Sequence, residues 1–144
     1  NFTQFIEWPA EAFSSADSPL VIGIVGPDPF GAFIDQTVQG ETLQGHNLIV
    51  ERYNSVNEIG DCHILFIGFD NKGDVRSALD KVRTKPILTV SDADGFARNG
   101  GMIRFYSESG KIRIRINMEA VQDANLVISS KLLRLADIIP AANN

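Results

Sequence analysis

The stretch Leu20-Val-Ile-Gly-Ile-Val25 carries no polar side chain, and it lies between Pro19 and the pair Gly26-Pro27. A short apolar run bounded by turn residues is typical of a strand that is buried on both faces, as in a parallel sheet. Similar segments are predicted to form neighbouring strands: Leu48–Val50 leading into Tyr53, Cys62–Phe69 and Pro86–Val90. These runs predict the sheet at the centre of the fold.

Helical patterns lie between these predicted strands. One helix is predicted from Pro29 to Val38. The clearest helix spans Asp74–Arg83, where apolar residues recur at the i, i+3, i+4 and i+7 spacing of one helix face. Asp74 is the predicted N-cap of this helix, because its carboxylate can accept from free amides of the first turn. Strands that alternate with helices indicate parallel βαβ units with right-handed crossovers.

The last third of the chain has a different pattern. Met102–Tyr106 and Lys111–Ile116 flank a short link that contains Gly110, which predicts an antiparallel hairpin. Further helices are predicted at Phe2–Trp8, Met118–Ala124 and Ser129–Ile139. The predicted fold class is α/β: a single domain over residues 1–139, with a mixed, mostly parallel sheet, helices on both faces and an antiparallel edge hairpin, followed by a loose tail at 140–144.

Composition and charge narrow the class of protein. The chain has 144 residues, which fits one domain, and a formal net charge of −5. This charge argues against nucleic acid as a partner, because the phosphate backbone requires a basic surface. No apolar run is long enough for a membrane-spanning helix. Cys62 is the only cysteine, so the chain forms no internal disulfide and no multi-cysteine metal site. Cys62 opens an apolar run, and we expect it to be buried.

The sequence contains no motif of an enzyme. It lacks HExxH, GxSxG and the phosphate-binding GxxxxGK[ST] pattern. His63 lies in an apolar strand and is expected to be a core residue rather than a base or ligand, whereas His46 lies beside Gly45 and is expected to be exposed. Asp92 and Asp94 are too few to predict a calcium site, and a turn is the alternative. We therefore predict a protein that is not an enzyme and holds no metal or cofactor.

Two loops follow predicted strands at their carboxyl ends, where ligands bind in open α/β sheets. The first, Gly26–Gly31, leads into a helix N-terminus, which offers free amides to an anion. A rigid proline-rich turn is the other interpretation of this loop. The second loop runs from Ser91 to Gly101. A small-molecule site at these loops would use the following residues: Gly26, Asp28, Phe30, Ser91, Asp92 and Arg98.

Two groups of side chains are candidates for binding a protein partner. Along the predicted hairpin, Arg104, Arg113 and Arg115 alternate with apolar residues and would form a basic stripe that suits carboxylate or phosphate groups. A solvated sheet face is the alternative. Phe5 and Trp8 lie in the aromatic-rich start of the chain, and aromatic residues are favoured anchors at interfaces. A place in the core is the alternative for these two residues.

Five short blocks occur in a fixed order along the chain: Phe2–Pro9, Cys62–Ile67, Pro86–Asp92, Gly100–Ile103 and Ile128–Ala136. Together they resemble the YfiR-like family of periplasmic regulatory proteins, over nearly the whole chain. The resemblance implies a small exported α/β protein that restrains a membrane-bound diguanylate cyclase or similar sensor, and so controls cyclic di-GMP signalling and biofilm formation. Relatives form homodimers, so the resemblance allows a homodimer, and the sequence leaves the oligomeric state open. The disulfides of some relatives do not carry over, because this chain has one cysteine.

The resemblance also bears on location and partner. The sequence shows no basic start or apolar leader, and it begins within the helix predicted at Phe2–Trp8, where relatives have more helix and an export signal. We therefore expect a mature fragment in the periplasm from which a signal peptide has been removed. The expected partner is the periplasmic region of an inner-membrane diguanylate cyclase or sensor protein. The alternative function is that of a small-molecule-binding sensor domain.

Overall fold

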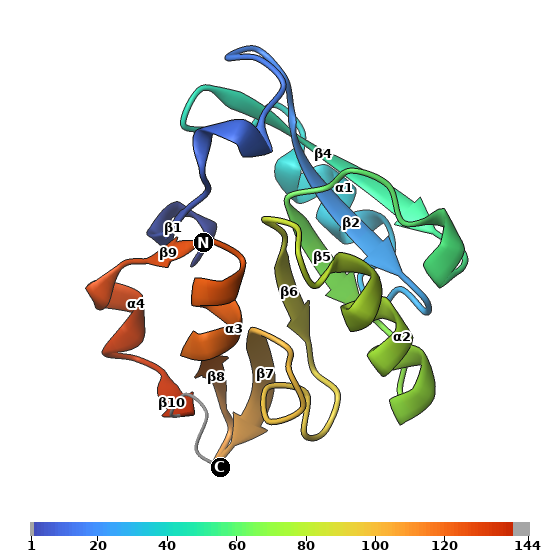
Figure 1. Cartoon of the computed structure of the whole chain (residues 1–144), viewed down its shortest axis with the longest axis vertical. Coiled ribbons are helices and arrows are strands. Elements are labelled where there is room, and N and C mark those ends of the chain that lie inside the picture. The colour runs from blue at the N-terminus through green and yellow to red at the C-terminus, as the bar shows by residue number, and fades with distance from the viewer. Residues whose placement is uncertain (1, 140–144) are drawn as a thin grey trace.

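The computed structural model describes residues 2–139, so the tail predicted at 140–144 lies outside the described residues. An eight-stranded sheet crosses the molecule (Figure 1). Its strands, in spatial order, are β10 (Asp137–Ile139), β8 (Lys111–Asn117), β7 (Ile103–Glu108), β6 (Leu88–Ser91), β5 (Ile64–Ile67), β2 (Leu20–Val25), β4 (His46–Tyr53) and β3 (Thr42–Leu43). A second, two-stranded sheet pairs β1 (Ile6–Glu7) with β9 (Val127–Ile128).

The central strands β6, β5, β2 and β4 run parallel to one another, as the apolar runs predict. Every residue of β2 is buried, because packed side chains cover both faces of the sheet there. Antiparallel pairs lie toward the two sides of the sheet, β7 with β8 and β4 with β3. The fold class is therefore α/β with a mixed, mostly parallel sheet, and the prediction is confirmed.

Helices flank the sheet on both faces. The α-helices are α1 (Ala32–Val38), α2 (Lys72–Val82), α3 (Met118–Asp123) and α4 (Ser130–Leu133), and short 3-10 helices lie at Phe2–Phe5, Ala10–Ala12 and Val56–Glu58. On one face, the core includes side chains from α1, α3 and α4. On the other face, Val75, Ala78 and Val82 of α2 are buried, which confirms the apolar stripe predicted for this helix.

The prediction of one helix over Phe2–Trp8 is wrong. The 3-10 helix ends at Phe5, and the chain continues as β1, in which Ile6 pairs with Ile128 of β9. The i, i+3, i+4 pattern of the apolar residues covers one helical turn, and one turn has little stability of its own. Ile6 is wholly buried, so the packing of its side chain and the pairing with β9 determine the local structure.

The prediction of a helix over Ser129–Ile139 is also wrong beyond its first turn. Helix α4 ends at Leu133, and Asp137–Ile139 forms β10, which pairs in parallel with β8. The hairpin therefore lies one strand in from the edge of the sheet. Leu135, which the helical pattern places on the apolar stripe, is 76% exposed. Backbone pairing with β8 determines the path of this segment, and a side-chain pattern does not reveal such pairing.

The helix α2 begins two residues before the predicted start. Its N-cap is Asn71, and the side-chain oxygen of Asn71 accepts the backbone N–H of Asp74 at 2.8 Å. The prediction that Asp74 is the cap is wrong, because Asn71 and Asp74 are both good capping residues and the sequence does not decide between them. Asp74 instead lies in the first turn, where its carboxylate interacts favourably with the helix dipole.

Candidate functional site

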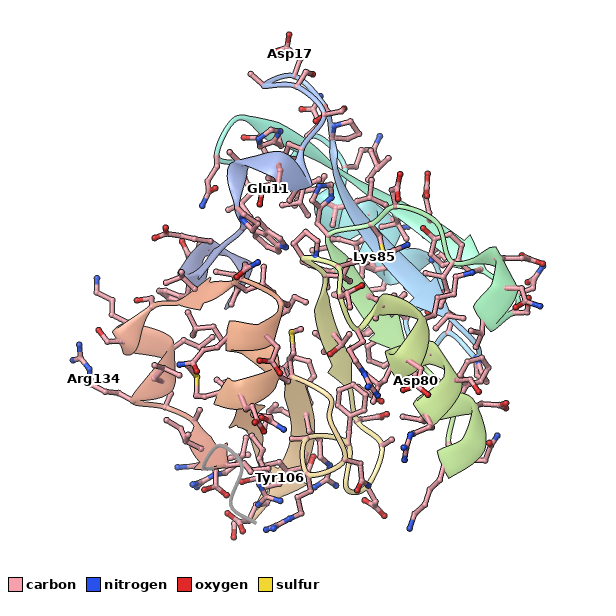
Figure 2. The ribbon with its side chains drawn as sticks, viewed as in Figure 1. Glu11, Asp17, Asp80, Lys85, Tyr106 and Arg134 are labelled. Atoms are coloured by element: carbon pink, nitrogen blue, oxygen red, sulfur yellow. The ribbon has the colours of Figure 1, made fainter. Side chains whose placement is uncertain are left out.

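The hairpin brings the three predicted arginines to one face of the sheet. Arg104 pairs with Arg115 and Tyr106 pairs with Arg113 across β7 and β8, and residues opposite each other on neighbouring strands point to the same side. The predicted sharing of one face is therefore confirmed by the register. We call these four residues the arginine face. The label of Tyr106 in Figure 2 marks the position of the arginine face on the hairpin.

Each arginine of this face already has a carboxylate partner within the chain. Arg104 contacts Asp94 at 2.8 Å, and Arg115 contacts Asp137 at 2.9 Å. Arg113 is 3.6 Å from Glu108. All three carboxylate side chains are more than half exposed, and such pairs contribute at most about 1 kcal/mol each. A carboxylate on a partner can therefore replace them at little cost.

Tyr106 is a member of the arginine face that the sequence analysis missed. The guanidinium groups of Arg104 and Arg115 lie 5.3 and 4.8 Å from the centre of its ring. Partial burial disfavours the charged form of Arg115, but the hydrogen bonds from Arg115 to Asp137 outweigh this and raise the pKa of Arg115. The sequence could have indicated this contact, because a tight hairpin between the two predicted strands places Tyr106 opposite Arg113.

Phe5 and Trp8 lie at a different edge of the sheet. Trp8 donates from Nε1 to the carbonyl of His63, just before the start of β5, at 2.9 Å. Arg104, in contrast, pairs with Ser91 at the carboxyl end of β6. Both aromatic residues are partly buried and pack against the core, so part of their surface serves the domain itself. Their contact with a partner stays a prediction.

The loop after β2 is held in place by Arg52. Asp28 accepts the amide of Phe30 at 2.8 Å and contacts Arg52 at 2.6 Å, while Arg52 also reaches Asp35 and the carbonyl of Gly31, each at 2.8 Å. Burial alone would raise the pKa of the Asp28 carboxyl. The hydrogen bonds from Arg52 and from the Phe30 amide outweigh burial and lower it below 3.8. These contacts fix the turn.

A second turn separates the two loops that we predicted to form one site. Gly26 has a φ of 85°, and a Cβ at this position would lie 2.8 Å from the ring of Phe69 in the turn after β5. Beside it, Gly68 lies so close to Pro27 that a Cβ would collide with the Pro27 carbonyl oxygen. The turn at residues 68–70 thus packs directly against the loop after β2.

Three of the predicted ligand residues lie in the second loop, and one of them is buried while two are exposed. Ser91 is buried, and its hydroxyl donates to the carbonyl of Ile67 at 2.7 Å and accepts the amide of Ala93 at 3.1 Å. Asp92 and Arg98 are exposed. Ser91 therefore has its hydrogen bonds within the fold, whereas Asp92 and Arg98 are free to meet a ligand.

The predicted ligand residues border different cavities. Asp92 borders a cavity of about 440 Å³ together with Arg104 and Tyr106. Phe30 borders an apolar cavity, also about 440 Å³, between α1 and the sheet, where its ring meets the ring of Phe66 edge-on at 4.9 Å. A role for the six predicted residues as one ligand site stays a prediction. The apolar cavity had no sequence signal beyond Phe30, because its walls are ordinary core residues.

The amino edge of the sheet contains both histidines. His63 is buried, as predicted, but the prediction that His46 is exposed is wrong, since only 9% of its surface is accessible. Phe13 stacks between the two imidazoles, with ring centres 3.8 Å from His46 and 4.3 Å from His63. The burial of His46 depends on Phe13, which is distant in the sequence. Nothing in the polar link around Gly45 reveals this packing.

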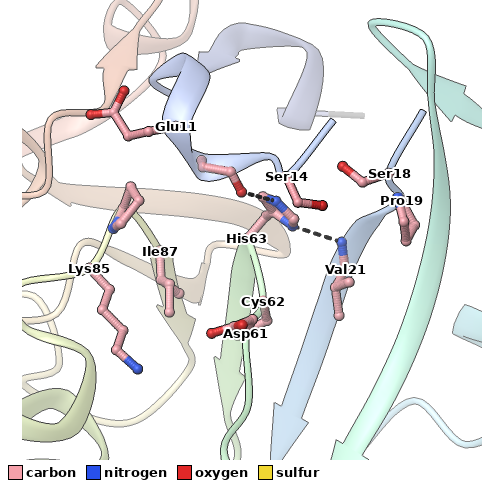
Figure 3. Close-up of a pocket in the computed structure, with 12 residues that line it drawn as sticks. Glu11, Ser14, Ser18, Pro19, Val21, Asp61, Cys62, His63, Lys85 and Ile87 are labelled. Carbon is pink, nitrogen blue, oxygen red and sulfur yellow. Dashed lines mark hydrogen bonds between the residues drawn. The ribbon is translucent and has the colours of Figure 1, made fainter. Parts of the chain in front are cut away.

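A pocket of about 470 Å³ opens beside His63 (Figure 3). Its charged lining residues are Glu11, Asp61 and Lys85. Cys62 also borders the pocket but is buried, as predicted, and burial raises the pKa of its thiol to about 12. A thiol with this pKa is not a reactive nucleophile.

The described residues contain neither a metal-binding cluster nor a membrane-spanning helix. Within residues 2–139, no three His, Cys, Asp or Glu side chains are grouped so that they could hold a metal ion. No helix in this part of the chain has the length and apolar character needed to cross a membrane.

A family model described as YfiR/HmsC-like covers residues 1–137. No curated protein matches the chain.

Proposed function

Because this chain belongs to the YfiR/HmsC-like family, we propose that it is a periplasmic regulator that binds the periplasmic region of a membrane-bound diguanylate cyclase or similar sensor and restrains it. The observation that carries the proposal is the family match, which extends over residues 1–137 of 144. The family consists of periplasmic regulators of such cyclases. Release of the cyclase would raise cyclic di-GMP and favour biofilm formation.

The proposed mechanism is a shift in the conformations of the receptor. The domain itself catalyses no reaction. A regulator that binds the inactive state of the cyclase more tightly than the active state stabilises the inactive state by the difference in binding free energy. The strength of restraint is therefore set by the contacts that are made in the inactive state alone.

We place the main contact on the arginine face. Arginine and tyrosine are over-represented among residues that dominate binding energy, and Tyr106 lies between two arginines. The register places the guanidinium groups of Arg104, Arg113 and Arg115 around this ring on one face of the sheet. A tyrosine ring among guanidinium groups fits a recognition surface for an acidic partner segment. Phe5 and Trp8 would form a second contact.

Calorimetry tests the proposal directly. The mature protein would be titrated with the periplasmic segment of the membrane cyclase encoded nearest to it, and we expect a sub-micromolar dissociation constant, equivalent to more than about 8 kcal/mol of binding free energy. Arg113→Ala should weaken binding at least about tenfold, a typical loss for an important interface residue. Arg83→Ala is the matched control, since Arg83 is also exposed and paired, with Asp80 at 2.7 Å. Absence of binding by the unaltered protein would contradict the proposal.

A second candidate function is suggested by the apolar cavity beside Phe30. Its volume of about 440 Å³ lies within the usual range of small-molecule sites, roughly 300–1,000 Å³. A sensor domain could use such a cavity to tune partner binding. A thermal-shift screen of small apolar compounds tests this, because a ligand at 100 times its dissociation constant stabilises a protein by about 2.7 kcal/mol. Filling the cavity with Val90→Phe should abolish any shift.

A further inference from the structure

His63 connects the start of the chain to the central sheet. Its ring is buried just before β5, and Nδ1 accepts the backbone N–H of Val21 in β2 at 3.0 Å. On the other side of the ring, Nε2 lies 2.8 Å from the carbonyl of Ala12 (Figure 3). A carbonyl only accepts, so Nε2 carries the proton and Nδ1 does not. These two bonds together require the neutral imidazole.

The segment that meets His63 is the N-terminal latch, which we define as residues 8–14. Phe13 stacks on the imidazole at 4.3 Å with an angle of 17° between the rings. Trp8 donates to the His63 carbonyl, and the carbonyl of Ala12 meets the ring at Nε2. The latch thus contacts both the side chain and the backbone of one titratable residue, whereas the preceding strand β1 is held by its pairing with β9.

We propose that protonation of His63 releases the N-terminal latch from the sheet, so that the domain contains an acid-sensitive switch. A proton on Nδ1 would face the N–H of Val21, so that two donors meet and the buried amide loses its acceptor. The ring would then be a buried cation whose Nδ1–H has no acceptor, which is unfavourable unless the ring becomes solvated. Undocking of the latch is what exposes it to water.

His46, the other histidine at this edge, is bonded differently. Its Nδ1 lies 2.6 Å from the carbonyl of Ser18, so this nitrogen is a donor. The two bonds of His63 require one nitrogen without a proton, whereas the bond of His46 does not.

Charged groups on every side of His63 affect its protonation. Burial lowers the pKa of His63 below its ordinary value of 6.5, and His46, across Phe13, acts in the same direction. The carbonyl of Ala12 and the carboxylate of Asp61 oppose this shift. Glu11 and Lys85 are the other charged residues near the ring, since they line the adjoining pocket together with His63 and Asp61.

The direction of the pH effect follows from this lowered pKa. The released form binds a proton near pH 6.5, whereas the docked form binds it only at lower pH. The docked state is therefore fully favoured above pH 6.5 and loses stability as the pH falls toward the docked pKa. The docked-to-released ratio should fall by up to about tenfold for each pH unit in this window.

The protein contains its own probe of the latch, because Trp8 is the only tryptophan. We would measure tryptophan emission and quenching by acrylamide between pH 7.5 and pH 5, with amide exchange in parallel. As the pH falls, emission should move to longer wavelength, quenching should increase, and the amide of Val21, whose acceptor is His63, should lose protection. The amide of Leu65 in β5 and the amide of Ser129, which is bonded to Phe5 outside the latch, should remain protected.

Two variants distinguish the histidines. His63→Asn keeps an acceptor for Val21 but does not titrate, so the transition should disappear. His46→Gln should keep the transition, with its midpoint moved to slightly higher pH because His46 contributes to lowering the pKa of His63. A transition that survives in His63→Asn, or its absence from the unaltered protein, would overturn the proposal.

An NMR titration of the unaltered protein covers the case in which His63→Asn does not fold. The ring resonances of His63 should titrate with the same midpoint as the change in Trp8 emission. A separation of the two midpoints, or simultaneous loss of protection at Leu65, would also overturn the proposal, because the change would then be unrelated to His63 or would be global unfolding.

Discussion

The amino edge of the sheet around His63 and the arginine face near the carboxyl edge hold polar groups in opposite ways. His63 is 7% exposed, and both of its ring nitrogens have backbone partners. Arg104 and Arg115 each contact a carboxylate that is itself open to solvent. A buried polar group must keep its hydrogen-bond partner within the fold, whereas an exposed group can exchange its partner for water or for a group on another protein. The first arrangement suits a switch, and the second suits recognition.

The largest effect is expected from His63→Leu, which removes the polar groups of the amino edge. Leucine can neither accept from Val21 nor donate to Ala12, and each unpaired buried group costs about 1–3 kcal/mol. The free energy of unfolding, measured with urea at pH 7.5, should fall by about 2–4 kcal/mol. His46→Leu, which loses one backbone bond, should cost roughly half as much. Equal losses in the two variants would contradict the comparison.

Ser91→Ala tests whether the carboxyl edge also contains a buried polar group whose hydrogen bonds stabilise the fold. The Ser91 hydroxyl is buried and bonds to Ile67 and Ala93, so its removal should lower the free energy of unfolding by about 1–2 kcal/mol. Ser107→Ala, at an exposed position of β7, should change it by less than about 0.5 kcal/mol. If the two variants behave alike in urea unfolding, Ser91 is not the buried anchor that the structure describes.

The pH response should also differ between the two edges. The pKa of the Asp28 carboxyl is lowered below 3.8 by Arg52 and the Phe30 amide, so its contribution to stability is complete above pH 3.8 and is lost as the pH falls through the folded pKa. The difference in urea midpoint between the unaltered protein and Asp28→Asn should therefore be constant from pH 7 to pH 5 and shrink near pH 3. If the difference in urea midpoint already shrinks between pH 7 and pH 5, the acid response in that range does not belong to His63 alone, which would contradict the comparison.

The smallest effect on folding is expected from Arg113→Ala. The pair with Glu108 is 3.6 Å long and exposed, so the free energy of unfolding should change by less than about 0.5 kcal/mol. The affinity for the periplasmic cyclase segment should fall at the same time. Urea unfolding and calorimetry on the same preparation separate the two effects. A large loss of stability would show that the arginine face is structural.

The sheet was predictable because its central strands are continuous apolar runs. Leu20–Val25 has no polar side chain for either face, which indicates burial on both, and the neighbouring central strands have the same pattern. The ends of the chain were not predictable on this basis. The strands Ile6–Glu7 and Asp137–Ile139 are too short to show a period, and each is determined by a partner strand distant in sequence.

The candidate site was predictable to a similar degree. Alternation along the hairpin placed Arg104, Arg113 and Arg115 on one face, which the register confirms. Their acidic partners come from elsewhere, since Asp94 lies in the preceding loop and Asp137 follows two helices later. Local sequence does not encode such pairings, and so the sequence predicts an unneutralised basic stripe where the fold contains ion pairs.

The close contact between Gly68 and Pro27 has a consequence for how this sequence can change over time. Any side chain at position 68 would collide with the main chain of the loop after β2, and main chain cannot rotate away as a side chain can. Substitution there requires a simultaneous rearrangement of that loop. We therefore expect the two segments to change together, whereas substitution at exposed positions such as Arg113 and Ile112 leaves the scaffold intact and could adapt it to a different receptor.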